Sequence, residues 1–160
     1  MCRIVILTDK NKALGLAVGR ANKEAVYFLV KVVKADVNAV IDTKFPETPL
    51  MIAAYYGSNL HQEIATFLIS NNAEINKPTA REPISTALTT AIWKDNLDFV
   101  KLLIKNGADP SLSFGGKKED YACRFALEKK RSHIIPYIPK CCDLAEKNST
   151  WMRESGYLCP

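Results

Sequence analysis

The chain has 160 residues, a length typical of one domain, and its 48% hydrophobic and 24% charged residues exclude a disordered tail and a membrane-embedded protein. Its 22 Lys and Arg against 17 Asp and Glu give a formal net charge of +5, which is less basic than dedicated nucleic-acid binders usually are. With 7 glycines and 8 prolines, the collagen-like and proline-rich classes are excluded as well.

The beginning of the chain predicts no secretory signal, because the apolar run Ile4–Leu7 is shorter than the hydrophobic segment of a signal peptide. The longest apolar run, Ala25–Val30, is far shorter than the roughly 20 residues that cross a bilayer. We therefore expect no membrane span. The five cysteines cannot all pair within one chain, and reduced thiols in an intracellular, cytoplasmic location fit them better. These cysteines are Cys2, Cys123, Cys141, Cys142 and Cys159.

Three similar segments follow one another along the chain. The first and loosest copy runs from Leu14 to Ala39, the second from Thr48 to Asn76, and the third from Thr86 to Ser111. Each copy predicts a helix rich in small residues, a polar turn, an amphipathic helix, and an ending of alanine, an acidic and an apolar residue. The final alanines lie 38 and 35 residues apart. Repeats of this length predict a solenoid, in which each unit packs only on its neighbours.

Local signals mark the helix boundaries in the two central copies. Thr48 and Thr86 are predicted N-caps, whose side-chain oxygens can accept hydrogen bonds from unpaired N–H groups of the first helical turn. Pro49 suits the first helical position, where an N–H would have no partner. Asn72 and Gly107 are predicted to end the second helices in the left-handed conformation. Each copy is thus predicted to be a helix-turn-helix unit.

Particular residues recur at fixed places in these two copies. One copy reads Thr48-Pro49-Leu50-x-x-Ala53-Ala54-x-x-Gly57, and the other ends on Leu102-Leu103-Ile104-Lys105-Asn106-Gly107-Ala108-Asp109-Pro110. Both resemble the ankyrin repeat, whose unit of about 33 residues carries a TPLHxA signature. The resemblance implies an all-α solenoid of helix-turn-helix units joined by β-hairpin-like loops. It also implies a structural role for the motif residues Thr48, Pro49, Leu50, Ala53, Ala54, Gly57, Thr86, Leu88, Ala91, Leu102, Leu103, Gly107 and Ala108.

The resemblance implies an ankyrin-repeat domain over residues 1–138, with repeats at about 13–39, 46–76, 84–111 and 119–138. The last copy is degenerate, and Pro136 is expected to cut its second helix short. Residues 139–160 are expected to form a C-terminal segment that either caps the last repeat or docks on a partner, because they are too apolar for a free tail. The apolar residues concerned are Trp151, Met152, Tyr157 and Leu158.

One departure from the family pattern concerns the cohesion between repeats. The histidine of the TPLH motif, which links adjacent repeats by hydrogen bonds in the family, is replaced by Met51, Thr89 and Arg124 in successive copies. We therefore expect a weaker polar network between repeats and a larger contribution from apolar packing. Each fully buried Leu, Ile or Phe stabilises the fold by about 1.5–3 kcal/mol.

The sequence offers no catalytic residue, metal site or cofactor site. It contains no GxxxxGK[ST], HExxH, GxSxG or CxxC pattern. The two histidines, His61 and His133, lie far apart, and the spacing of the C-terminal cysteines matches no standard zinc pattern. The glycine-containing stretch Ser113–Lys118 is better explained as a loop between repeats than as a phosphate-binding loop. We expect a non-enzymatic protein.

The resemblance directs attention to the concave face, where ankyrin proteins usually bind a partner. It assigns to this face the C-terminal ends of the first helices and the tips of the loops between repeats. Exposed aromatic residues there would suit an interaction hot spot. The alternative is that Tyr56 or Trp93 packs on a neighbouring repeat. The predicted binding residues are Arg20, Tyr55, Tyr56, Trp93, Lys94 and Lys129 at helix ends, and Lys44, Phe45, Glu47, Arg81 and Phe114 in loops; the sharpest prediction is the stripe Tyr55-Tyr56-Trp93.

Three functions are compatible with these observations. The first is a monomeric module that binds another protein through the concave groove. The second is a small inhibitor or adaptor, or a secreted pathogen effector acting in host cytoplasm, that masks a host signalling protein. The third and weaker one is binding to nucleic acid or an anionic surface through basic ends, because residues 1–34 and 117–133 carry +5 and +3 around a middle of −3. A salt titration separates the third, since phosphate contacts predict steeply salt-dependent affinity.

Overall fold

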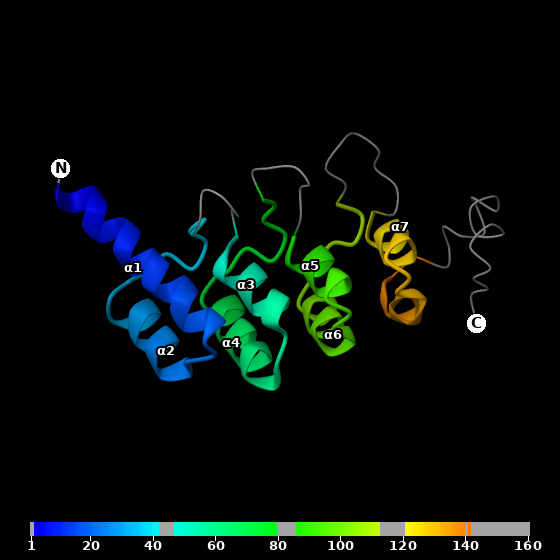
Figure 1. The fold of residues 1–160 in the computed structure, drawn as a ribbon, viewed down its shortest axis with the longest axis horizontal. Helices are drawn as coiled ribbons and strands as arrows, with labels where there is room; N and C mark the ends of the chain where they lie inside the picture. Colours follow the sequence, from blue (N-terminus) through cyan, green and yellow to red (C-terminus); the bar gives the residue numbers. More distant parts are fainter. Residues whose placement is uncertain (1, 42–46, 80–85, 113–120, 140, 142–160) are drawn as a thin grey trace.

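The computed structural model describes residues 2–41, 47–79, 86–112, 121–139 and 141, with only the backbone described for residues 2–9 and 121. These residues contain no strand, and their helices follow one another in pairs (Figure 1). The all-α solenoid predicted from sequence is confirmed. The helices are α1 (Cys2–Gly19), α2 (Lys23–Lys31), α3 (Pro49–Tyr56), α4 (Asn59–Ser70), α5 (Ala87–Trp93), α6 (Leu97–Lys105), α7 (Tyr121–Glu128) and the 3-10 helix η1 (Ser132–Tyr137).

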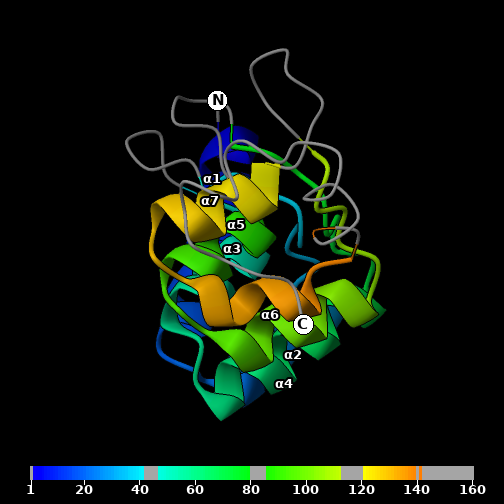
Figure 2. The same ribbon diagram turned by 90° about the vertical axis from the view of Figure 1, so that its right-hand side faces the viewer.

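The helices form two parallel rows. The first helices of the pairs are α1, α3, α5 and α7, and they pack on one another in chain order. The second helices of the pairs form a second row beside this first row (Figure 2). Because each unit contacts mainly the units next to it, the molecule is long rather than round. The helix α1 begins at Cys2, well before the predicted repeat start at residue 13.

The turns between paired helices share one backbone conformation. Ala21, Gly57, Asp95 and Lys130 each follow a first helix, and all four have positive φ angles between 53° and 65°. Glycine takes this left-handed conformation without steric cost, and other residues only with strain. The shared turn sets the register of the four units. Residues of the first helices at equal distance before this turn are therefore structurally equivalent.

The predicted helix caps are present. Thr48 Oγ1 accepts a hydrogen bond from the Met51 N–H (3.3 Å), and Pro49 occupies the first helical position. Thr86 caps α5 in the same way and forms a reciprocal capping box with Thr89, whose Oγ1 accepts from the Thr86 N–H at 2.8 Å. Asn72 and Gly107 have φ angles of 67° and 91°, as predicted for left-handed helix ends.

A continuous apolar core lies between the two rows of helices. Equivalent positions in successive units carry similar side chains, with leucine in the first helix and branched or aromatic residues in the second. These positions are buried whereas the opposite face of each second helix is exposed, so burial of one face stabilises each helix more than its own propensity does. The fully buried members include Leu14, Leu50, Leu88, Ile64, Leu68, Phe99 and Leu103.

Asparagine side chains supply a polar network between units, which corrects the expectation of weak polar links. Asn38 Nδ2 donates to the Asn72 carbonyl (2.9 Å), and its Oδ1 accepts from the Glu74 N–H (2.7 Å). Asn76 repeats the arrangement one unit later, with bonds of 3.3 Å to the Gly107 carbonyl and 2.9 Å from the Asp109 N–H. The amide carries a donor and an acceptor, so one side chain can satisfy both backbone groups.

In the first unit the two equivalent backbone groups are also hydrogen-bonded, but to two different side chains instead of one asparagine. Asn11 Oδ1 accepts from the Asp36 N–H (2.9 Å), and Lys10 Nζ donates to the Lys34 carbonyl (2.7 Å). Asp36 and Lys34 correspond to Glu74 and Asn72 of the next unit. Both the donor and the acceptor come from α1, so this helix supplies to the first unit the two polar groups that a loop asparagine supplies to each of the next two units.

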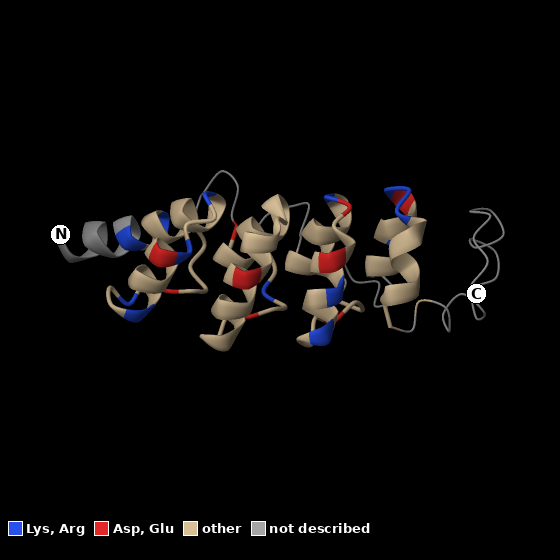
Figure 3. Ribbon diagram, turned by 90° about the horizontal axis from the view of Figure 1, so that it is seen from below, with Lys and Arg blue, Asp and Glu red and all other residues tan. Residues whose placement is uncertain are grey.

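The outer helices α2 and α4 are joined by an ion pair between Lys23 and Glu63. The hydrogen bond to Glu63, and then the attraction of its negative charge, raise the pKa of the Lys23 ammonium above its ordinary value. Both side chains are exposed, so solvent screens the pair and its effect on stability is small. Figure 3, which looks onto these helices, shows an acidic residue recurring along the row.

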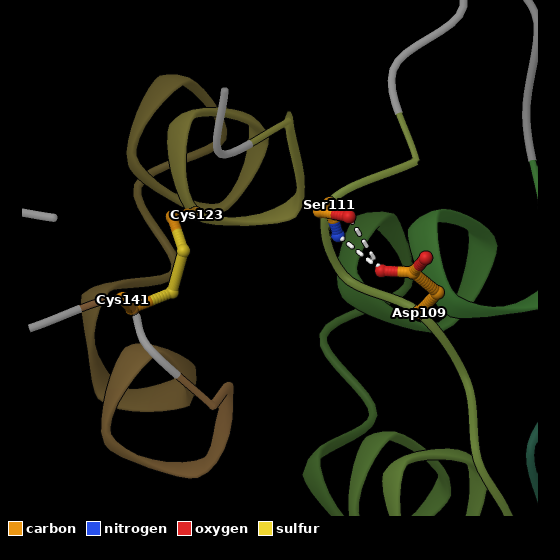
Figure 4. Close-up of a disulfide and its surroundings, with 4 residues drawn as sticks. All are labelled: Asp109, Ser111, Cys123 and Cys141. Carbon is orange, nitrogen blue, oxygen red and sulfur yellow. Dashed lines mark hydrogen bonds between the residues drawn. A yellow bond between two sulfur atoms is a disulfide. The ribbon is translucent and has the colours of Figure 1, made fainter. Parts of the chain in front are cut away.

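The last described unit departs from the others. Its second helix is the 3-10 helix η1, which contains Pro136; proline has no N–H to donate and opposes a regular α-helix. A disulfide joins Cys123 of α7 to Cys141 beyond η1, with their Cα atoms 5.8 Å apart (Figure 4). The preceding unit closes with a turn in which the Ser111 N–H and hydroxyl both donate to Asp109 Oδ1 (2.9 and 2.7 Å).

The disulfide corrects the expectation of unpaired thiols at these two positions. The sequence argument was that five cysteines cannot all pair, but this does not prevent two of them from pairing. Cys123 and Cys141 lie 18 residues apart, and η1 folds back to bring them together. Cysteine usage therefore no longer argues for a reducing compartment. Residues 142–160, with the predicted tail segment, lie outside the described residues.

Candidate protein-interaction surface

The predicted aromatic stripe lies at the C-terminal ends of the first helices. The shared turn places Gly19, Tyr55, Trp93 and Glu128 at one set of equivalent positions. The next residues, Arg20, Tyr56, Lys94 and Lys129, form a second set, which immediately precedes the left-handed residue of each unit. The solenoid thus brings residues more than 30 positions apart into two adjacent rows.

Tyr55 is the centre of an aromatic cluster. Its ring contacts the Tyr56 ring edge-on at a centroid distance of 5.2 Å and the Trp93 ring at 5.9 Å. Tyr56 also stacks on His61, with centroids 5.3 Å apart. Such pairs contribute about 0.5–1.5 kcal/mol beyond their buried area. The cluster therefore holds its rings in fixed positions across two units.

The three aromatic residues differ in exposure. Tyr56 exposes 57% and Trp93 49% of their surface, while Tyr55 is half-buried between them. The more buried residue is thus Tyr55, not Tyr56 or Trp93 as in the alternative interpretation of the sequence, and Tyr56 and Trp93 present large surfaces to solvent. Gly19 has no side chain beside Tyr56, and a β-carbon built there would lie 3.3 Å from the Tyr56 ring.

Three exposed cations accompany the aromatic residues. Lys94 Nζ lies 4.1 Å from the centroid of the Tyr55 ring and 5.2 Å from that of Trp93, distances at which an ammonium is attracted to an aromatic face. Lys129 Nζ lies 5.3 Å from the Phe125 centroid, and Arg20 is exposed at the end of α1.

Neighbouring carboxylates already have partners. Asp95 Oδ1 lies 3.2 Å from Arg131 Nε and 3.1 Å from His133 Nε2. Glu128 Oε1 lies 4.0 Å from Arg124 Nη2, one turn away on α7. Within the described ranges, no carboxylate forms an ion pair with Arg20, Lys94 or Lys129. The surface is therefore basic as well as aromatic.

The loop residues of the predicted set are mostly not described. Lys44, Phe45, Arg81 and Phe114 lie outside the described residues. Glu47 is half-buried, and its carbonyl accepts a hydrogen bond from the Ile41 N–H (3.1 Å). Of the predicted set, the helix-end residues therefore define the surface that the structure describes.

His61 is a residue whose role sequence reasoning missed. It exposes only 6% of its surface, its Nδ1 lies 2.6 Å from Ser58 Oγ, and its ring supports Tyr56. Ser58 in turn caps α4 by accepting a hydrogen bond from the His61 N–H (3.4 Å). Ser-x-x-His before an apolar stripe is an N-cap signal, and it could have placed His61 in the first turn of α4.

A groove of about 370 Å³ also lies on the outer side, between α2 and α4. Its walls are Val26, Tyr27, Ile64 and Phe67, with the Lys23–Glu63 ion pair at its rim. The sequence missed it because the apolar stripes of these helices predicted burial. Tyr27 and Phe67 lie 5.6 Å apart between centroids, yet Tyr27 remains largely exposed.

The part of the chain that the structure describes contains no group of three or more His, Cys, Asp or Glu side chains placed to hold a metal ion. Of its helices, none has the length and apolar character needed to cross a membrane.

Comparison with known proteins agrees with the repeat architecture. Residues 14–113 match the family described as ankyrin repeats, in three copies. The human protein named "Ankyrin repeat and KH domain-containing protein 1" is 37% identical to the chain over 103 residues. The match covers 64% of this chain and 4% of the human protein, so this chain corresponds to a small part of that relative. The matched residues include α2 to α6 and all three copies of the repeat identified above. The chain belongs to the ankyrin-repeat family.

Proposed function

We propose that the protein is a non-enzymatic module that binds a partner protein through the ends of its first helices. Ankyrin repeats are generally protein–protein interaction modules, and the family resemblance points to the concave face without specifying which residues contact the partner. The observation that carries the proposal is the exposure of Tyr56 and Trp93 beside the packed ring of Tyr55.

These residues have the properties of interaction hot spots. Aromatic side chains dominate binding energy at interfaces because they bury a large area and have few rotatable bonds. Here the rings are also held by neighbours, so binding immobilises little additional side-chain freedom. In a soluble domain, two half-exposed aromatic residues on a rigid scaffold mark a surface that gains free energy when covered.

The test is selection of ligands from a random peptide library displayed on phage, with the full chain as bait. The variant Tyr56→Ala/Trp93→Ala removes the two exposed rings and leaves the half-buried Tyr55 in place. The matched control, Phe28→Ala/Val32→Ala, removes two exposed apolar side chains from the outer helix and its C-cap. Circular dichroism verifies that each variant keeps its helices.

The proposal predicts that peptides selected on the unmodified chain lose binding to Tyr56→Ala/Trp93→Ala and keep it on the control. Peptides that bind all three proteins equally would contradict it, as would a selection that enriches no peptide. Loss of binding only on the control would move the binding surface to the outer helices.

A further inference from the structure

We propose that the partner presents an extended acidic segment, whose carboxylates meet Arg20, Lys94 and Lys129 while an apolar side chain packs on Tyr56. This inference rests on the proposed function, because it assigns the chemistry of the ligand at the same surface. It concerns the second of the two rows of equivalent positions, which we call the basic row: Arg20, Tyr56, Lys94 and Lys129.

The basic row is a consequence of the repeat register. Each member is the residue immediately before the left-handed turn of its unit, so the four side chains recur once per unit along one edge of the solenoid. Figure 3 shows Lys and Arg at this edge beside the first, third and fourth helix pairs, and none at the second. By the repeat register the second member of the row is Tyr56, which is exposed.

The charge of the row is not neutralised within the described chain. Asp95 and Glu128, the acidic neighbours in sequence, are held by Arg131 and Arg124. Lys94 lies over the rings of Tyr55 and Trp93, so a carboxylate that reaches its ammonium also meets an aromatic surface. A cation near a helix C-terminus is favoured by the helix dipole, but the dipole acts on each helix separately and does not predict a ligand.

The spacing of the row specifies the ligand further. Adjacent packed helices lie roughly 8–10 Å apart, and an extended chain advances about 3.3 Å per residue. One unit of the solenoid therefore corresponds to about three residues of an extended ligand. Acidic residues at positions 1, 4 and 10 would meet Lys129, Lys94 and Arg20, with an apolar residue at position 7 opposite Tyr56; the reversed order serves the opposite chain direction.

Fluorescence anisotropy with labelled ten-residue peptides tests this assignment. One peptide carries Asp at positions 1, 4 and 10 and Leu at position 7 in a Gly/Ser background, and a second has the reversed order. A third has lysine in place of each Asp, and a fourth has the three Asp residues adjacent. We expect one of the first two to bind at least about tenfold more tightly than the lysine peptide, because like charges on closely apposed surfaces repel strongly. Its affinity should fall as salt is added.

The variants Lys94→Glu and Arg20→Glu should each weaken binding of that peptide by about fivefold or more, since an attractive contact becomes repulsive. Lys105→Glu makes the same charge change at the exposed end of α6 and should leave binding unchanged. If all three variants weaken binding equally, the peptide is attracted by the overall charge of the protein and not by the basic row, which would overturn the proposal. Equal binding of the spaced and adjacent acidic peptides would overturn the spacing, and tight binding of the lysine peptide would overturn the charge assignment.

The phage selection separates this inference from the proposed function. If binding of the selected peptides requires Tyr56 and Trp93 and the peptides are enriched in acidic residues, both the proposed function and the acidic-segment assignment are supported. If they depend on these rings but are neutral or basic, the acidic-segment assignment fails and the binding surface remains. If no peptide depends on the rings, the proposed function fails.

Discussion

Asn38 joins two units through both polar groups of its amide, one bonded to the Asn72 carbonyl and the other to the Glu74 N–H. The partners lie 34 and 36 residues away in the sequence. An asparagine in a polar loop gives no local sign of such bonds, and comparison with the family motif directs attention to Met51 instead. For this reason the polar network could not be predicted.

Replacement of Asn38 by alanine removes both hydrogen bonds and leaves two backbone groups without these partners. Because each such bond contributes about 0.5–1.5 kcal/mol net, we expect the free energy of unfolding to fall by about 1–3 kcal/mol. Urea denaturation of Asn38→Ala measures it. Asn59→Ala, at an exposed position that begins α4, is the control. A loss no larger than that of the control would contradict the structural role of Asn38.

Gly57 and Gly107 both have positive φ angles, 65° and 91°, but differ in surroundings. A β-carbon at Gly57 would collide with the Asn96 amide, whereas nothing lies within 4 Å of one at Gly107. Asn96 Nδ2 donates to the Gly57 carbonyl (2.6 Å), and its Oδ1 caps α6. At Gly57 a methyl group therefore disturbs a bond between units as well as the backbone.

We predict that Gly107→Ala lowers the free energy of unfolding by about 1–2 kcal/mol, the cost of the left-handed conformation for a residue with a β-carbon. Gly57→Ala should cost about 1–3 kcal/mol more, because the Asn96 bonds are also lost. Thermal or urea unfolding of the two variants gives the comparison. An equal loss in both variants would show that Asn96 adapts without cost.

At the scale of helices and turns, sequence reasoning succeeded where the signals are local. Thr48, Pro49 and Thr86 were predicted at the helix starts that they occupy, because a cap bonds only to residues within its own first turn. The second helix of the last unit is also disrupted as predicted, because the segment that contains Pro136 is a 3-10 helix. The Cys123–Cys141 disulfide was missed, since it depends on how η1 folds back onto α7.

The disulfide is expected to hold η1 on the last unit, where no regular second helix exists. Closing a loop of this length stabilises the closed structure by about 3 kcal/mol in the chain-entropy description. Reduction should therefore speed hydrogen exchange at the Ile134 and Ile138 amides by one or two orders of magnitude. Amides of α3 should keep their protection, because η1 packs mainly on α7 and α6.

Hydrogen exchange followed by mass spectrometry, with and without reductant, measures this difference. Alkylation of free thiols in the same samples verifies that the reductant opened the disulfide. Exchange in η1 that does not change after verified reduction would show that packing of Ile134 and Ile135 alone holds this segment.

At the scale of the whole molecule, stability is distributed along the solenoid. Each first helix packs on the first helices before and after it, so a defect in one unit acts on its neighbours and weakens with distance. The length of the chain suggested one ordinary domain, and only the repeats in its sequence revealed this linear organisation.

Leu103→Ala creates a cavity in the third unit, where Leu103 is fully buried, and should cost about 2–5 kcal/mol. We expect faster hydrogen exchange in α5, α6 and α7 and little change in α1 and α2. Lys105→Ala, an exposed change on the same helix, is the control for helix propensity. Equal acceleration of exchange in all helices would indicate a single cooperative unit instead.

The binding surface was only partly predictable. The family resemblance located the helix ends, and Tyr56 and Trp93 are exposed there. The half-burial of Tyr55 and the position of Lys94 over two rings depend on contacts between units that no local pattern encodes. The outer groove was missed because an apolar helix stripe predicts burial whether or not a neighbour fills the space.

Site-specific photo-crosslinking tests the central claim, which is that the partner binds at the ends of the first helices. A benzophenone amino acid replaces Trp93 in one protein and Phe28 in another; both positions are aromatic and about half exposed, the first on α5 and the second on α2. The account predicts that irradiation in extract of the native cells gives a discrete protein adduct from position 93 and none from position 28. An adduct from position 28 alone, or from neither position, would contradict it.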